Sequence, residues 1–150
     1  PVLADEALRL FIEARQQVEF FPDVIDALQG LSFHYRLGAL TNGNADLGAI
    51  GVGHLFDSAL YATLRLPAKP APDMFLLAAS ELGVATDRIL HVGDNADTDI
   101  GGARAVGCKT AWINRFDESY PEDKPRADID IKTLDDLIAL APPLPGNTLH

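Results

Sequence analysis

The hydrophobic and polar positions of this chain follow two periods in turn. Apolar residues recur at helical spacing over 2–20, 24–31, 73–82, 98–106 and 134–141. Short apolar runs typical of strands occupy 37–40, 56–61, 89–92, 110–113 and 129–131. Helices and strands therefore alternate, which predicts an α/β fold, a doubly wound parallel sheet with helices on both faces.

Glycine, proline and capping residues set the expected ends of these elements. Pro72 and Asp73 are typical of a helix start, and Gly83 of its end. Thr133 and Asp136 are spaced as a capping box for the last helix. A short helix is expected within 45–55, a polar loop over 114–127 and a loose, proline-rich tail over 142–150.

Composition and charge narrow the class of protein. The chain has 150 residues, enough for one domain with its own core, and 47% of them are hydrophobic. A net charge of −10 argues against a nucleic-acid partner, because phosphate backbones are bound through clustered Lys and Arg. No apolar run approaches the roughly 20 residues of a membrane helix. Cys108 is the only cysteine, which fits a reducing, cytoplasmic location.

The stretch over 89–107 carries the clearest candidate chemistry. A predicted strand ends at Gly93-Asp94, and Asp99 follows in the first turn of the next helix. In open α/β sheets, ligands bind at the carboxyl ends of strands, and paired carboxylates there suit Mg²⁺. The alternative is structural, since Asp97 or Asp99 could simply cap the helix.

Two weaker signals lie earlier in the chain. Thr41 and Asn42 follow the strand over 37–40, where a hydroxyl and an amide could hold a phosphate oxygen or could only form a turn. Lys69 lies in a proline-flanked loop, as a positioned cation for phosphate or as an ordinary surface charge.

Three segments together resemble the motifs of the haloacid dehalogenase-like (HAD) hydrolases. They are LGALTN over 37–42, Lys69-Pro70 and HVGDNADTD over 91–99, in the family's order and spacing. The stretch over 20–46 is most similar to the capped phosphatase branch related to bacterial flavin-mononucleotide phosphatases. The resemblance spans nearly the whole chain and implies a Rossmann-type core over 21–141.

The resemblance also implies a role for each motif residue. Thr41, Asn42 and Lys69 would bind the transferring phosphoryl group, with Thr41 and Lys69 acting in catalysis. Asp94 would ligate Mg²⁺, and Asp99 would support the metal site. The implied activity is Mg²⁺-dependent hydrolysis of small phosphorylated metabolites through an aspartyl-phosphate intermediate.

The chain departs from the family pattern at its beginning. The family's nucleophile motif, a strand ending DxDxT, is missing, and the near match Asp128-Ile129-Asp130 lies where the family has its closing strand. Residues 1–20 resemble the last helix of a helical cap. Because the chain begins at Pro1 and its only methionine is Met74, we expect its natural start to be missing. The resemblance then implies a core that lacks its first strand, with a slot between the strands ending at Thr41 and Gly93. Leu66 also stands where the family often has Gly.

Three hypotheses remain open at this stage. The chain is part of a Mg²⁺-dependent phosphatase and inactive by itself, or part of a metal-independent dehalogenase-type hydrolase, or a non-catalytic HAD-like binding module. The Asp94 and Asp99 pair favours the first hypothesis, because two adjacent carboxylates without a cation would repel each other.

Overall fold

Parallel strands form the centre of the molecule. The computed structural model describes residues 6, 9–10, 13–14 and 17–140. Strand β1 (Gly38–Thr41) pairs in parallel with β2 (Ser58–Tyr61). Strands β3 (Leu90–Gly93), β4 (Lys109–Ile113) and β5 (Ile129–Ile131) form a second parallel sheet in that order. The expected strands and their parallel pairing are confirmed.

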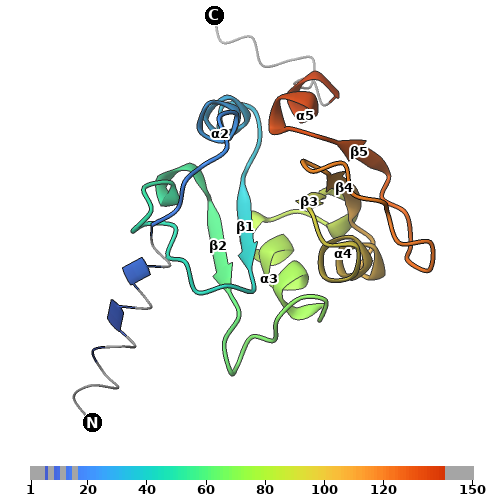
Figure 1. The fold of residues 1–150 in the computed structure, drawn as a ribbon. Helices are drawn as coiled ribbons and strands as arrows, with labels where there is room; N and C mark the ends of the chain where they lie inside the picture. Colours follow the sequence, from blue (N-terminus) through green and yellow to red (C-terminus); the bar gives the residue numbers. More distant parts are fainter. Residues whose placement is uncertain (1–5, 7–8, 11–12, 15–16, 141–150) are drawn as a thin grey trace, which may run out of the picture.

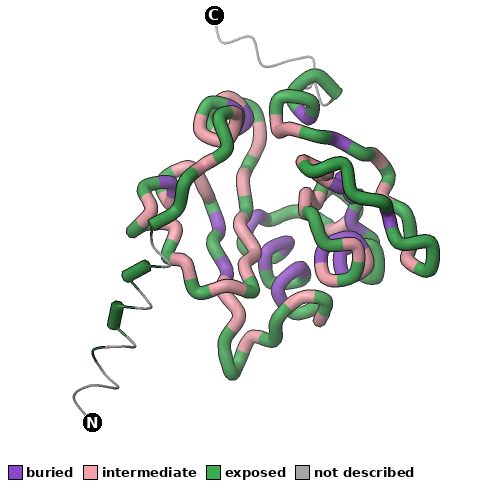
Figure 2. The backbone as a smooth tube through the Cα atoms, in the orientation of Figure 1, coloured by how far each residue is buried: buried purple, intermediate pink, exposed green. Residues whose placement is uncertain are grey.

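Helices cover both faces of this layer (Figure 1). Helices α2 (Val24–Ser32) and α5 (Leu134–Leu140) lie together on one face, and α3 (Asp73–Leu82) and α4 (Gly102–Ala105) lie on the other. Each face has its own apolar cluster. The first is built on Leu31, Ala111, Ile131 and Leu137, and the second on Phe75, Ala103 and Cys108. Figure 2 shows buried positions along α3, α4 and β4. The fold is therefore the predicted doubly wound α/β type.

Local sequence signals account for most of the element ends. Gly83 takes a left-handed conformation with φ 66°, and its N–H closes α3 on the Ser80 carbonyl oxygen. The Thr133 hydroxyl accepts from the Asp136 N–H at 3.2 Å, and the Asp136 carboxylate accepts from the Thr133 N–H at 3.0 Å. This reciprocal pair is the predicted capping box at the start of α5.

The segment between β1 and β2 differs from its prediction, and two terminal predictions cannot be compared. The helix predicted within 45–55 is wrong, because this segment forms turns and the short 3₁₀ helix η1 (Gly53–Leu55). The Asp46 carboxylate holds the turn by accepting from the N–H groups of Gly48 and Ala49, and Gly51 has φ 87°. Most of the helix expected over 2–20, and all of the tail over 142–150, lie outside the described residues.

The helix after β3 begins with an unusual turn. A π-helical segment, η3 (Ala96–Gly101), continues directly into α4. The Asn95 side-chain oxygen caps it by accepting from the N–H groups of Asp97 and Thr98, at 2.9 and 2.8 Å. The capping function considered for Asp97 or Asp99 therefore belongs to Asn95. The remaining short element is the 3₁₀ helix η2 (Thr86–Arg88).

The two sheets meet at one polar edge without pairing. Among the described residues, no strand lies between β1 and β3. Hydrogen bonds nevertheless link Asn42, directly after β1, to Lys69, and Lys69 to Asp99 in the segment after β3. The carboxyl ends of β1 and β3 therefore share one edge of the layer. None of the described helices combines the length and apolar character needed to cross a bilayer.

Candidate active site

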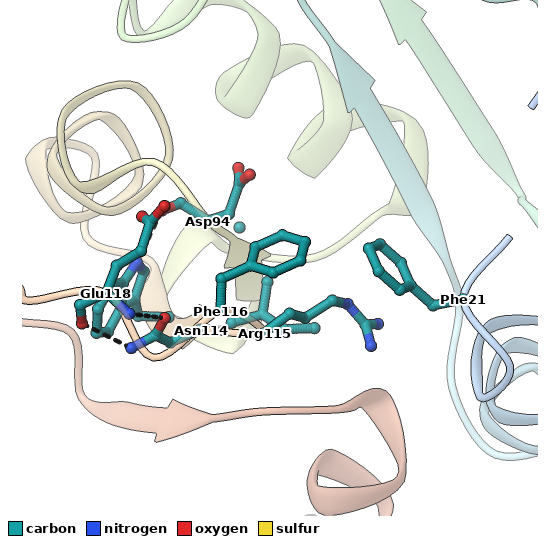
Figure 3. Close-up of a pocket in the computed structure, with 9 residues that line it drawn as sticks. Phe21, Asp94, Asn114, Arg115, Phe116 and Glu118 are labelled. Atoms are coloured by element: carbon teal, nitrogen blue, oxygen red, sulfur yellow. Dashed lines mark hydrogen bonds between the residues drawn. The ribbon is translucent and has the colours of Figure 1, made fainter. Parts of the chain in front are cut away.

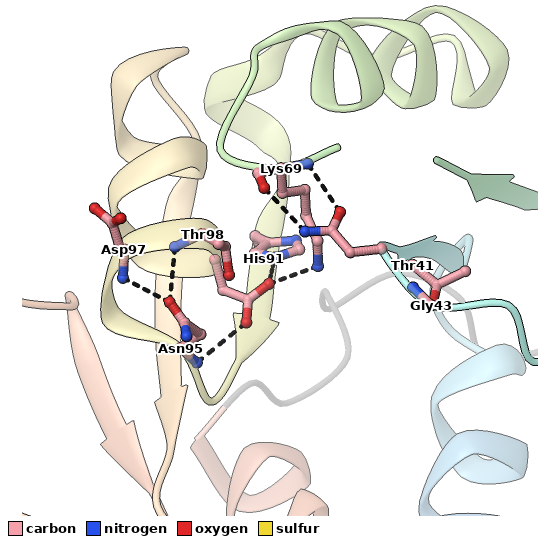
Figure 4. A network of polar contacts seen from close by, with 9 residues as sticks. Thr41, Gly43, Lys69, His91, Asn95, Asp97 and Thr98 are labelled. Atoms are coloured by element: carbon pink, nitrogen blue, oxygen red, sulfur yellow. Dashed lines mark hydrogen bonds and ion pairs between the residues drawn. The ribbon is translucent and has the colours of Figure 1, made fainter. Parts of the chain in front are cut away.

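A buried charge cluster occupies the polar edge of the sheets (Figure 4). The Lys69 ammonium nitrogen lies 2.6 Å from Oδ1 of Asp99, and Nε2 of His91 lies 3.2 Å from the same oxygen. The side chains of Lys69, His91 and Asp99 are only 10%, 10% and 8% exposed. Lys69 comes from the loop before α3, His91 from β3 and Asp99 from η3. Three separate elements therefore converge on one carboxylate.

The ionised form of Asp99 is strongly favoured in this setting. Burial by itself would raise the pKa of the carboxyl, but hydrogen bonds from His91 and Lys69 outweigh it and lower the pKa to about 2. The second oxygen of Asp99 accepts from the Asn95 N–H at 3.1 Å. Both oxygens are thus engaged by protein donors, and Asp99 holds Lys69 and His91 in place.

Gly93 makes room for this carboxylate. A Cβ atom on Gly93 would lie 2.3 Å from Cγ and 2.5 Å from Oδ2 of Asp99, far inside the contact distance of real side chains. A glycine at the end of β3 therefore permits Asp99 to lie directly against the strand.

Asn42 fixes the backbone of the lysine. Its side-chain nitrogen donates to the Lys69 carbonyl oxygen at 2.9 Å, and its side-chain oxygen accepts from the Lys69 N–H at 2.8 Å. The Lys69-Pro70 peptide bond is cis. Beside Asn42, the Thr41 hydroxyl oxygen accepts from the Gly43 N–H at 3.0 Å, which leaves its own proton available for donation.

Asp94 differs from Asp99 in having an uncommitted carboxylate. It is exposed at the end of β3, and no hydrogen bond or ion pair joins its side chain to another described residue. Its backbone is held in place, because the Trp112 indole N–H donates to the Asp94 carbonyl oxygen at 2.7 Å. An exposed carboxylate beside a fixed backbone is suited to bind a cation or a substrate.

A cavity of about 320 Å³ lies against Asp94 (Figure 3). Its lining includes Phe21, Phe116 and Arg115. The Arg115 guanidinium lies 4.3 Å from the centre of the Phe21 ring and donates twice to Asp23, at 2.8 and 3.1 Å. Arg115 also keeps the pKa of the Asp23 carboxyl below its ordinary value. The loop after β4 is thereby tied to the segment that precedes α2.

These residues fit a divalent cation through Asp94. Mg²⁺ is typically held by one or two carboxylates together with waters and substrate phosphate oxygens. Asp94 offers a carboxylate of this kind, whereas Asp99 is already engaged. Among the described residues, no group of three His, Cys, Asp or Glu side chains converges as a complete metal cage. The geometry suits a site that substrate and water complete.

The five site residues that the sequence predicts lie at this edge of the sheets, and two further residues that contact them were not predicted. Asn42, Lys69 and Asp99 form a connected chain of hydrogen bonds, Thr41 directly precedes Asn42, and Asp94 directly follows β3. The missed contributors are His91, which contacts Asp99, and Asn95, which caps the following helix. A histidine inside an otherwise apolar strand, two residues before a glycine, was the available signal for His91.

The architecture is that of a Rossmann-like α/β enzyme with its site at the carboxyl edge of parallel strands. The profile of the haloacid dehalogenase-like hydrolases matches residues 2–107. The chain therefore belongs to the haloacid dehalogenase-like hydrolase family, as its motifs indicated.

Individual relatives include both phosphatases and dehalogenases. The chain is 38% identical over 110 residues to the 5-amino-6-(5-phospho-D-ribitylamino)uracil phosphatase YigB of Escherichia coli, covering 73% of this chain and 46% of that protein. It matches the structure of 2-haloacid dehalogenase from Pseudomonas syringae pv. Tomato DC3000 with a TM-score of 0.87 and 36% identity, covering 92% and 60% of the two chains. A HAD phosphatase from Thermococcus onnurineus matches with a TM-score of 0.78 and 30% identity, covering 88% and 62%. The chain spans about half the length of the curated relatives it matches.

Proposed function

We propose that this chain belongs to a Mg²⁺-dependent phosphohydrolase of small phosphorylated metabolites. The observation that carries the proposal is the contrast between two carboxylates at one sheet edge. Asp99 is committed to Lys69, whereas Asp94 has no described partner and borders a cavity. This contrast supports separate roles, with Asp94 as the metal ligand and Asp99 as the residue that supports the site through Lys69.

The chain's own residues would bind and orient the phosphoryl group. Lys69 uses one of its three donors on Asp99 and can direct the others at phosphate oxygens, and the Thr41 hydroxyl can donate to a further oxygen. The contacts of Asn42 support a contribution to phosphate binding that acts through the position of Lys69. When bound, Mg²⁺ would neutralise charge that develops on the phosphoryl oxygens.

The nucleophile of the proposed reaction lies outside the described residues. The family resemblance implies an aspartate that forms an aspartyl-phosphate, and neither Lys69 nor Thr41 is suited to replace it. In this proposal the whole protein supplies that aspartate, and this chain supplies the phosphate and metal contacts. A reducing, cytoplasmic setting is part of the proposal and is supported by the buried free thiol of Cys108.

A dehalogenase is the second candidate, because one of the matched structures is a 2-haloacid dehalogenase. The Lys69–Asp99 pair could serve either chemistry, since a positioned ammonium can bind a carboxylate or a phosphate. The free carboxylate of Asp94 favours the phosphatase.

The two candidates predict different products from the whole protein. We expect inorganic phosphate from phosphate monoesters, with loss of release in EDTA and recovery with added Mg²⁺. We expect no chloride from 2-chloropropionate. Chloride release that is insensitive to EDTA, without phosphate release, would contradict the proposed phosphatase activity and support the dehalogenase.

A further inference from the structure

The peptide unit between Asp94 and Asn95 is held at both of its polar groups. Its carbonyl oxygen, on Asp94, accepts from the Trp112 indole N–H at 2.7 Å. Its N–H, on Asn95, donates to Oδ2 of Asp99 at 3.1 Å (Figure 4). The two partners come from different elements, Trp112 from β4 and Asp99 from η3. Because a peptide unit is planar, hydrogen bonds at both of its polar groups prevent it from rotating about the chain direction.

The residue before Asp94 is fixed by the sheet. Gly93 is the last residue of β3, and it is paired in register with Trp112 of β4. The Cα atom of Asp94 therefore lies between a residue held by strand pairing and a peptide unit held by side chains. The backbone on both sides of a Cα atom sets the direction of its Cα–Cβ bond. The Asp94 carboxylate thus extends from a fixed point, although the residue itself is exposed.

Trp112 is suited to hold this peptide unit because its own ring is fixed by packing. The residue is 6% exposed and belongs to a buried cluster with Ile100 and Tyr120. The Tyr120 ring meets the indole edge to face, with 4.8 Å between the ring centres and 89° between the ring planes. Tyr120 is anchored in turn, because its hydroxyl donates to the Pro125 carbonyl oxygen. The loop after β4 therefore supports the indole that contacts Asp94.

We propose that Trp112 is a positioning residue for Asp94, and that it acts through the Asp94–Asn95 peptide unit to direct the carboxylate at the cation. Asp99 holds the same peptide unit with one carboxylate oxygen and contacts the Lys69 ammonium with the other. Asp99 thereby fixes Lys69 relative to Asp94, and the Trp112 indole holds the remaining polar group of the peptide unit. The inference rests on the proposed function, because it takes Asp94 as the Mg²⁺ ligand.

A purely structural hydrogen bond is the alternative for Trp112. A buried indole N–H normally finds an acceptor, and many carbonyl oxygens would serve. The acceptor here belongs to Asp94, whose side chain borders a cavity and has no partner among the described residues. Removing a group that orients a metal ligand typically weakens metal binding by about 10- to 100-fold. A structural bond would affect stability and leave metal affinity unchanged, so the two interpretations are separable.

Mg²⁺ binding to the whole protein, followed by NMR, tests the role of Trp112. Trp112→Phe removes the N–H donor, and the backbone amide signals of Asp94 and Asn95 report the bound cation. We expect the apparent Mg²⁺ affinity to fall about tenfold. Without Mg²⁺, amide hydrogen exchange at Asn95 should become faster, because the peptide unit can then rotate.

Tyr120→Phe is the matched control for this measurement. It removes one donor to a backbone carbonyl oxygen from the same aromatic pair, and it leaves the bond from Trp112 to Asp94 in place. Both the Mg²⁺ affinity and the amide exchange at Asn95 should therefore stay as in the wild type.

A second replacement separates the lost donor from lost volume. Benzothienylalanine at position 112 has the shape of tryptophan with sulfur in place of the N–H, so it removes the hydrogen bond without leaving a cavity. It should reproduce the weaker Mg²⁺ binding, and circular dichroism checks that each variant folds. If the wild type binds Mg²⁺ and the folded replacements at Trp112 bind it equally well, the positioning role is overturned. A wild type without any Mg²⁺ response at Asp94 would instead contradict the proposed metal site itself.

Discussion

Nζ of Lys69 lies 2.6 Å from Oδ1 of Asp99, and both side chains are nearly buried. The pair joins the loop before α3 to the segment after β3, across a distance of 30 residues in sequence. Removing one partner of a buried ion pair leaves the other charge uncompensated, which is more costly than losing a surface pair. The contact therefore couples the stability of the fold to the position of the candidate catalytic lysine.

Asp99 should make the stability of the chain depend on acid. Its pKa is lowered from 3.8 to about 2, so its contribution is fully present above about pH 4 and is lost as the pH falls toward 2. The shift corresponds to roughly 2 kcal/mol. In urea denaturation between pH 5 and 2, the wild type should lose about this much more unfolding free energy than Asp99→Asn.

Asp97→Asn is the matched control for this measurement. Asp97 lies two residues away, but its side chain is 63% exposed and pairs with Lys124 at the surface. Its substitution should preserve the acid dependence of the wild type. If the Asp99→Asn variant loses as much unfolding free energy at low pH as the wild type does, a group other than Asp99 causes the acid dependence.

Asn42→Ala should destabilise the loop before α3 that carries Lys69. It removes both side-chain hydrogen bonds to the Lys69 backbone and should cost about 1 kcal/mol of unfolding free energy. Amide hydrogen exchange at Lys69 should become faster. Asn114→Ala is a reciprocal control, because Asn114 holds the backbone of Glu118 through the same two kinds of bond. It should accelerate amide hydrogen exchange at Glu118 and leave exchange at Lys69 unchanged. Faster exchange at Lys69 in both variants would show that Asn42 does not hold the Lys69 backbone specifically.

Gly93→Ala should destabilise the fold by about 1–3 kcal/mol, because the new methyl group overlaps the Asp99 side chain. Gly101→Ala provides the contrast. Gly101 has helical dihedral angles of φ −61° and ψ −47°, and its Cβ would meet nothing closer than 3.4 Å. That substitution should be neutral or stabilising by up to about 1 kcal/mol. Thermal unfolding of the two variants measures the difference, and equal effects would argue against the close contact at Gly93.

The sequence predicted the elements better than the contacts between them. Apolar runs located the five strands of the described residues, and the capping signals at Gly83 and Thr133 marked helix ends, because these features depend on neighbouring residues. The contacts of Asn42 with Lys69 and of His91 with Asp99 were not predictable, because they join residues 27 and 8 apart through the folded chain. The segment 45–55 was mistaken for a helix because its apolar spacing concealed the turn formed by Asp46 and Gly51.

The 150-residue chain should not hydrolyse p-nitrophenyl phosphate by itself. In the proposed site Thr41, Lys69 and Asp94 hold a phosphate and a cation, but without the proposed aspartate nucleophile we expect only a residual rate, orders of magnitude below that of an intact enzyme. Phosphate release by the purified chain is the measurement. Turnover that Asp94→Asn abolishes would place a nucleophile within these 150 residues.

The role of Asp94 is tested most directly by the Mg²⁺ dependence of phosphate release from the whole protein. Asp94→Asn is nearly isosteric but loses a ligand charge, so it should lower both the apparent Mg²⁺ affinity and the rate by about tenfold or more. Asp97→Asn, the exposed neighbour, should retain both. An Asp94→Asn enzyme with unchanged Mg²⁺ dependence would contradict the assignment of Asp94 as the metal ligand and, with it, the proposed phosphatase site.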